Sequence, residues 1–121
     1  MTKKRMLSFK YAFEGIATSM RDQPNLVIQF CIAAIVLAAG YYFQITKAEW
    51  LITTLTIGFV ITFELTNTAI EEIVDSFTDQ VHPAAKKAKD VAAAAVLTAS
   101  ITAAIVGIII FFPYILTIFL Q

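Results

Sequence analysis

Three long apolar runs, separated by short polar segments, dominate the pattern of residues along the chain. They cover about residues 26–43, 48–74 and 90–120. A helix needs about 20 residues to cross the hydrocarbon layer of a membrane, and each run reaches or approaches that length. The second run turns polar after Phe63 while its helical spacing continues, and the third is long enough to require a tilt or a protruding end. The pattern predicts three membrane-spanning helices.

The segment before the first run, about residues 5–22, has the spacing of an amphipathic helix. Its large apolar side chains recur every three or four residues and therefore share one stripe of a helix. These residues are Met6, Phe9, Phe13, Ile16 and Met20. Pro24 then favours the start of a new helix. We predict a helix that lies on the membrane surface, with its cations toward the headgroups. Packing of the same stripe on protein is the alternative.

Composition agrees with lipid as the solvent for most of the chain. Hydrophobic residues make up 59% of the 121 residues and charged residues 15%, whereas soluble domains are nearer 45–50% and about 25%. The mean hydropathy is +0.77. The formal net charge is zero, and no nucleic-acid-binding motif is present, so a nucleic-acid partner is not expected. We predict an all-α membrane protein in which residues 1–121 form a single domain.

The distribution of basic residues predicts the orientation in the membrane. The segment before the first span holds five of the nine: Lys3, Lys4, Arg5, Lys10 and Arg21. The first connection holds only Lys47, and the second holds Lys86, Lys87 and Lys89. Because basic residues are retained in the cytoplasm, the N-terminus and the second connection are expected there, and the C-terminus outside.

A polar stripe follows the apolar part of the second span. Glu64, Asn67, Glu71 and Asp75 are separated by three, four and four residues, which places them within roughly 80° of arc on a helix. Carboxylates at these spacings repel one another and are costly to bring near lipid without a partner. A divalent cation offsets both effects, and oxygen ligands suit Mg²⁺. The stripe therefore indicates a metal site.

Two other interpretations of the stripe stay open at this point. A helix end wetted by water accounts for Glu72 and Asp75, but poorly for Glu64, which follows a long apolar run. A proton or cation path would also use carboxylates within the membrane, although the other two spans carry no matching charge. At the third span, Lys89 could bind phosphate, and Asp90 could instead cap a helix.

The twelve residues from Glu64 to Asp75, Glu-Leu-Thr-Asn-Thr-Ala-Ile-Glu-Glu-Ile-Val-Asp, resemble the signature of the small prokaryotic diacylglycerol kinases. That family includes the undecaprenol kinases of Gram-positive bacteria. Ala88-Lys89-Asp90, followed by an alanine-rich helix, is similar to the family's second signature, and the resemblance covers essentially the whole chain. It implies an ATP-dependent lipid kinase of the bacterial inner membrane. His82-Pro83 and the Ala88–Ala95 stretch favour undecaprenol over diacylglycerol as the substrate.

The resemblance also implies a homotrimer with active sites shared between protomers, and a role for each matched residue. Glu64 corresponds to the general base that takes the proton of the lipid hydroxyl, and Glu71 to the main Mg²⁺ ligand. The residues implied at the nucleotide are Tyr11, Asn67, Asp75, His82, Lys89 and Asp90.

One position departs from the family pattern. The family usually has a second metal-binding glutamate just before the first span, and this chain has Gln23 there. An amide oxygen can ligate Mg²⁺ but brings no charge, so we expect weaker metal binding, or a substitution by Asp22. The departure keeps a catalytically degenerate trimer of the same fold as an alternative, and a small cation-coupled transport subunit is a further one.

Overall fold

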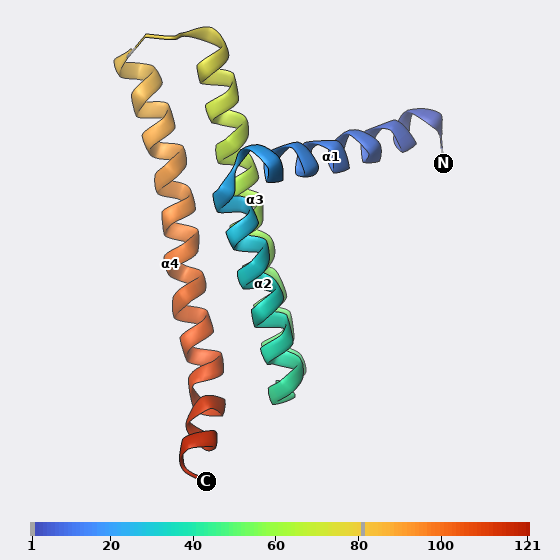
Figure 1. Cartoon of the computed structure of the whole chain (residues 1–121), viewed down its shortest axis with the longest axis vertical. Helices are drawn as coiled ribbons and strands as arrows, with labels where there is room; N and C mark the ends of the chain where they lie inside the picture. Colours follow the sequence, from blue (N-terminus) through green and yellow to red (C-terminus); the bar gives the residue numbers. More distant parts are fainter. Residues whose placement is uncertain (1, 81) are drawn as a thin grey trace.

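The computed structural model describes residues 2–80 and 82–121, which form four helices (Figure 1). They are α1 (Lys3–Asp22), α2 (Pro24–Phe43), α3 (Lys47–Phe77) and α4 (Pro83–Phe119). The last three are long and apolar enough to cross a membrane. The predicted all-α membrane fold, with an N-terminal helix followed by three spans, is confirmed.

Local sequence signals set the ends of α1, α2 and α3. Gln23 alone separates α1 from α2, and Pro24 occupies the first turn of α2, where its missing N–H is no loss. Gln44 ends α2 in the left-handed conformation, with φ of 51°. Thr46 then starts α3 through a capping box with Glu49, whose carboxylate accepts from the Thr46 N–H at 2.8 Å. The box satisfies two backbone donors that the helix itself leaves free.

The start of α4 differs from the sequence expectation. The third span was predicted from residue 90, but the helix begins at Pro83, and Nδ1 of His82 accepts from the Ala84 N–H at 3.2 Å. Asp90 is therefore not a helix cap, because it lies well inside α4. Hydropathy marks where a helix enters lipid, whereas alanine and lysine favour helix in water as well. The helix also continues through Pro113.

The bundle is organised around α3. Helix α4 packs beside α3 over much of its length, and α2 packs on α3 as well. Helices α2 and α4 have no comparable contact with each other in the described residues. Most large apolar side chains of the spans stay exposed, Ile35 at 69% and Leu55 at 63% among them. Apolar surface of this extent is unfavourable in water, so lipid or another copy of the chain must cover these side chains.

Helix α1 leaves the bundle roughly crosswise to the spans (Figure 1). Its second half shares a pocket with Leu65, Thr68, Ala69 and Glu72, so it crosses α3 at that height. The stretch of α3 from Lys47 to Leu65 rises about 27 Å, close to the ~30 Å of a hydrocarbon layer. An α1 that lies on the membrane surface thus puts Glu64 at the membrane boundary and the rest of the stripe beyond it.

A polar contact holds the opposite end of the bundle together. The Tyr114 hydroxyl of α4 donates to Oε2 of Glu49 at 2.6 Å, and its ring lies 5.7 Å from that of Phe43 in α2. The side chain of Tyr114 thus contacts the capping box of α3 through Glu49 and the end of α2 through Phe43. It links all three spans at this end of the bundle.

We expect Tyr114→Phe to lower the melting temperature of the fold modestly, because the hydrogen bond to Glu49 is lost. The loss is modest for a hydrogen bond to a charged group, because the carboxylate keeps its bond to the Thr46 N–H. Thermal unfolding in detergent measures the change, and Tyr41→Phe is the matched control, since Tyr41 is 83% exposed. An equal melting temperature for the two variants would contradict the prediction.

Candidate active site

The polar stripe lies on the part of α3 that extends from the height of α1 to the end of the helix (Figure 1). Nδ2 of Asn67 donates to Oε1 of Glu71 at 3.2 Å, so two members of the stripe are in direct contact. Helical spacing brings these residues together, and α3 continues without a break from the apolar span into the stripe. The site is thus built on a rigid element.

Among the described residues, Glu64 is the one acidic residue in the interior of the protomer, with 7% of its surface exposed. None of the ion pairs among the described residues includes it. A buried carboxylate without a cation or a hydrogen-bond donor is costly, and structures retain such a group mainly where it has a function. Its position at the membrane boundary suits chemistry between a lipid and a water-soluble substrate.

Asn67 and Glu71 present oxygen atoms that fit a hard cation. Oδ1 of Asn67 is buried and has no hydrogen-bond partner, while Nδ2 of the same amide is held by Glu71. No group of three or more His, Cys, Asp or Glu residues that could hold a metal occurs in the described part of the chain. Mg²⁺ commonly takes one or two carboxylates and completes its shell with water and phosphate oxygens. The residues present therefore fit a magnesium ion shared with a nucleotide.

Two ion pairs lie near the end of the stripe. Nζ of Lys89 reaches from α4 to Oδ1 of Asp75 at 2.9 Å, which links the two helices. Asp90 instead pairs with Lys86 one turn earlier in α4. Exposed pairs of this kind add little stability. Their charges stay available to a ligand, and Lys89 is the cation that lies directly at the stripe.

The other predicted site residues have no hydrogen bond to the stripe among the described residues. Tyr11 is 62% exposed on α1, and Gln23 donates its peptide N–H to the Ser19 carbonyl at 2.8 Å. The side chain of His82 accepts the Ala84 N–H at the start of α4. Among the described residues, no hydrogen bond joins any of these three to Glu71. Helix α1 packs on the face of α3 that carries Leu65 and Ala69.

Sequence reasoning missed one neighbour of the stripe. Lys87 of α4 and Asn67 line the same pocket between α3 and α4, which has a volume of about 500 Å³. Lys87 was counted only for membrane orientation, because it was assigned to the polar connection before the third span. Its helical spacing from Val91, another lining residue, would have revealed it once the start of α4 at Pro83 was known.

Comparison with known proteins agrees with this site. The model of the family described as prokaryotic diacylglycerol kinase matches residues 10–111, a range that includes every stripe residue. The match favours a lipid kinase over a transport subunit.

Individual relatives extend the comparison. The chain is 42% identical to undecaprenol kinase of Bacillus subtilis over 106 residues, which cover 88% of this chain and 86% of that protein. It is 36% identical to diacylglycerol kinase of Synechocystis over 93% of this chain and 65% of that protein. It is 28% identical to diacylglycerol kinase of Haemophilus influenzae over 87% of this chain and 90% of that protein. The chain therefore belongs to the prokaryotic diacylglycerol kinase family and is a membrane lipid kinase.

Proposed function

We propose that this kinase transfers the γ-phosphoryl group of ATP to undecaprenol, with diacylglycerol as the second candidate acceptor. The observation that carries the proposal is the buried carboxylate of Glu64, unpaired in the protomer and one turn from the Asn67–Glu71 pair. The identity with the undecaprenol kinase of Bacillus subtilis supports the choice of acceptor. The reactive hydroxyl then meets ATP at the height of α1.

Glu64 acts as the general base. It accepts the proton of the lipid hydroxyl while the hydroxyl oxygen bonds to the γ-phosphorus and the bond from that phosphorus to the bridging oxygen breaks, so that ADP leaves. Glu71 and the side-chain oxygen of Gln23 would hold Mg²⁺, which would supply neutralisation of the phosphate charge. A general base of this kind contributes about 10²- to 10⁴-fold in rate. The remaining task of the protein is to position the two substrates in line.

The nucleotide lies toward the end of α3 that carries Asp75. Asn67 and Lys89 position the phosphates, the lysine as a point charge released from its pair with Asp75. The other contacts to the nucleotide come from Tyr11, Asp75, His82 and Asp90. In this proposal the protein is a homotrimer whose sites combine residues of neighbouring copies. The large exposed apolar surface of the spans is available for that assembly.

The protein is oriented with its N-terminus and the α3–α4 connection in the cytoplasm of a bacterium, and with its C-terminus outside. Helix α1 and the α3–α4 connection lie toward one end of the bundle and the C-terminus at the other (Figure 1), in line with the basic residues. This orientation gives the stripe access to cytoplasmic ATP. The whole chain, residues 1–121, acts as one kinase domain.

Phosphate transfer from labelled ATP in detergent–lipid micelles tests the proposal. Undecaprenol and diacylglycerol are offered in parallel, with Mg²⁺ or with a chelator. We expect Mg²⁺-dependent transfer with a higher rate on undecaprenol. Faster transfer to diacylglycerol would reverse the choice of acceptor, and transfer to neither by a folded protein would refute the proposed activity.

Replacement of the amide at the usual glutamate position should strengthen metal binding. We expect Gln23→Glu to lower the Mg²⁺ concentration at half-maximal rate by roughly 10-fold, at least as much as loss of a group that only orients a metal ligand changes affinity. A Mg²⁺ titration of the kinase rate measures the shift, with Gln44→Glu, exposed at the opposite end of α2, as the control for an added glutamate. An unchanged metal dependence would remove Gln23 from the site.

A further inference from the structure

The one histidine of the chain holds the first turn of α4 in a way that the proposed chemistry does not yet use. His82 is the N-cap residue of the helix, and its Nδ1 accepts a hydrogen bond from the Ala84 N–H at 3.2 Å. Its carbonyl accepts from the Lys86 N–H at 2.9 Å, and Pro83 has no N–H that needs a partner. His82 and Pro83 together therefore account for most of the donors that a helix start leaves free.

The same hydrogen bond fixes where the imidazole carries its proton. A neutral imidazole has one donor nitrogen and one acceptor nitrogen, and the bond from Ala84 makes Nδ1 the acceptor. The proton therefore lies on Nε2. That nitrogen has no hydrogen-bond partner within residues 2–80 and 82–121, and His82 is exposed. A ligand that meets it must offer an acceptor, such as an oxygen of a phosphate or a nitrogen of a base.

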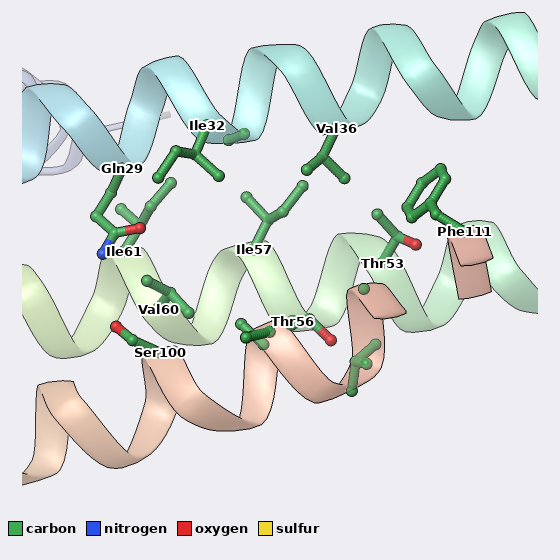
Figure 2. Close-up of a pocket in the computed structure, with 15 residues that line it drawn as sticks. Gln29, Ile32, Val36, Thr53, Thr56, Ile57, Val60, Ile61, Ser100 and Phe111 are labelled. Carbon is green, nitrogen blue, oxygen red and sulfur yellow. The ribbon is translucent and has the colours of Figure 1, made fainter. Parts of the chain in front are cut away.

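Few contacts other than the cap hold the first two turns of α4 in place. Deeper in the membrane α4 packs on α3, and Figure 2 shows Ser100 of α4 beside Val60 of α3 at the cavity that the spans enclose. Residues 82–88, by contrast, are mostly exposed. The nearest polar link to α3 among the described residues is the ion pair of Lys89 with Asp75, and an exposed pair of this kind adds little stability. The cap is therefore a main determinant of whether these turns stay helical.

The turns that the cap holds lead to the cation of the proposed site. Lys89 follows His82 by seven residues, so the two lie within roughly 20° of arc on α4 and about 10 Å apart along its axis. They share the side of the helix from which Nζ of Lys89 reaches Asp75 of α3. If the first turns unwind, Lys89 loses the helical frame that directs it toward the stripe. The position of its charge thus depends on a hydrogen bond two turns away.

We propose that His82 is a positioning residue for phosphoryl transfer, because its Nδ1 caps α4 and thereby holds Lys89 at the stripe. The inference rests on the proposed role of Lys89 in binding the phosphates. It adds to the nucleotide contact proposed for the same side chain, for which the cap leaves Nε2–H as the donor. One imidazole therefore links the order of α4 to the binding of the nucleotide.

Two variants of His82 isolate the cap, because both remove Nε2–H and only one removes the acceptor. Asparagine is among the best N-cap residues and alanine among the poorest. We expect His82→Asn to bind ATP roughly 5-fold more tightly than His82→Ala, the effect of one good cap on the population of an intact helix end. Equilibrium binding of ATP with Mg²⁺ to the full-length protein in detergent micelles, without a lipid acceptor, measures the difference. Equal affinities in the two variants would overturn the proposal.

The route through Lys89 is tested in a second background. When Lys89 is replaced by methionine, which keeps an unbranched stem without the charge, His82→Asn and His82→Ala should bind ATP equally. A difference that persists in this background would refute the positioning of Lys89.

Thr46→Ala is the control for the loss of a helix cap as such. It removes the cap of α3 at the opposite end of the bundle, and we expect it to leave the affinity for ATP unchanged. A loss as large as that of His82→Ala would assign the effect to general destabilisation and would contradict the proposal.

Two measurements of structure test the cap without reference to turnover. Because the chain has one histidine, ¹⁵N-histidine labelling of protein purified without a histidine tag gives the NMR signals of a single imidazole, and we expect its proton on Nε2. Amide hydrogen exchange at residues 84–88 should be slower in the wild type and in His82→Asn than in His82→Ala. A proton on Nδ1, or equal exchange in the three proteins, would overturn the proposal.

The outcomes separate this proposal from the proposed function. If the two His82 variants differ in ATP binding as expected but the wild type phosphorylates no lipid, the proposed function fails and the positioning of Lys89 stands. If the wild type transfers phosphate and the two variants bind ATP equally, the kinase stands and the positioning role fails. A folded wild type that binds no ATP would refute both.

Discussion

Glu64→Gln should reduce the turnover number by about 10²- to 10⁴-fold, the contribution of a general base. The substitution keeps the shape of the side chain and removes its capacity to accept a proton. The apparent affinity for ATP should change little, because Glu64 is buried at the membrane boundary and the proposed phosphate contacts lie further along α3. The ATP dependence of the steady-state rate with undecaprenol separates the two effects.

Glu72→Gln is the matched control for Glu64→Gln. Glu72 lies on the same helix but is exposed and faces α1 rather than the stripe. It should keep the wild-type turnover number. A Glu64→Gln protein with the wild-type rate, or an equal loss in both variants, would show that the carboxylate of Glu64 is not the base.

Glu71→Gln should abolish most of the metal-supported turnover, with a loss of at least about 10²-fold, since removal of one charge-stabilising group at a transition state costs that much. The variant should also retain its hydrogen bond with Asn67, because an amide oxygen can accept from Nδ2 in place of the carboxylate oxygen. The fold and the oligomer should therefore survive. Kinase rates over a Mg²⁺ titration, together with the size of the detergent-solubilised particle, measure both expectations.

The metal dependence distinguishes a lost ligand from a misplaced helix. If Glu71 holds the ion, the residual rate of Glu71→Gln should rise with Mg²⁺ well beyond the concentration that saturates the wild type. A rate that is low at every concentration in a dissociated protein would point to a structural role. A rate equal to that of the wild type would exclude Glu71 from the site.

The spans were predictable because the bilayer imposes a simple rule on the chain. Lipid offers no hydrogen bonds, so apolar runs of sufficient length must be helical. The crosswise α1 was predictable for a related reason, since one stripe of this helix is apolar while its remaining surface carries charge. The start of α4 was missed because the hydropathy of the chain shows only the part of a helix that lies in lipid. Residues 83–89 include three lysines and are not an apolar run, yet alanine and lysine favour a helix there without any contribution from lipid.

The core of the site was visible from helical spacing alone. Glu64, Asn67, Glu71 and Asp75 lie on one continuous helix, and local geometry places them together without help from the rest of the fold. The contact between Lys89 and Asp75 required the hairpin of α3 and α4, because these residues lie on different helices. Sequence spacing carries no information about which faces of two helices meet.

By itself, the sequence determined that three helices cross a membrane, that a fourth precedes them, and that one span carries a polar stripe at its end. Each of these properties follows from hydropathy or from local periodicity. Only the tertiary structure decided that α1 crosses α3 beside Leu65 and Ala69, and that Lys87 shares a pocket with Asn67. Those features depend on how side chains from separate helices pack, and packing is a property of facing surfaces rather than of any one segment.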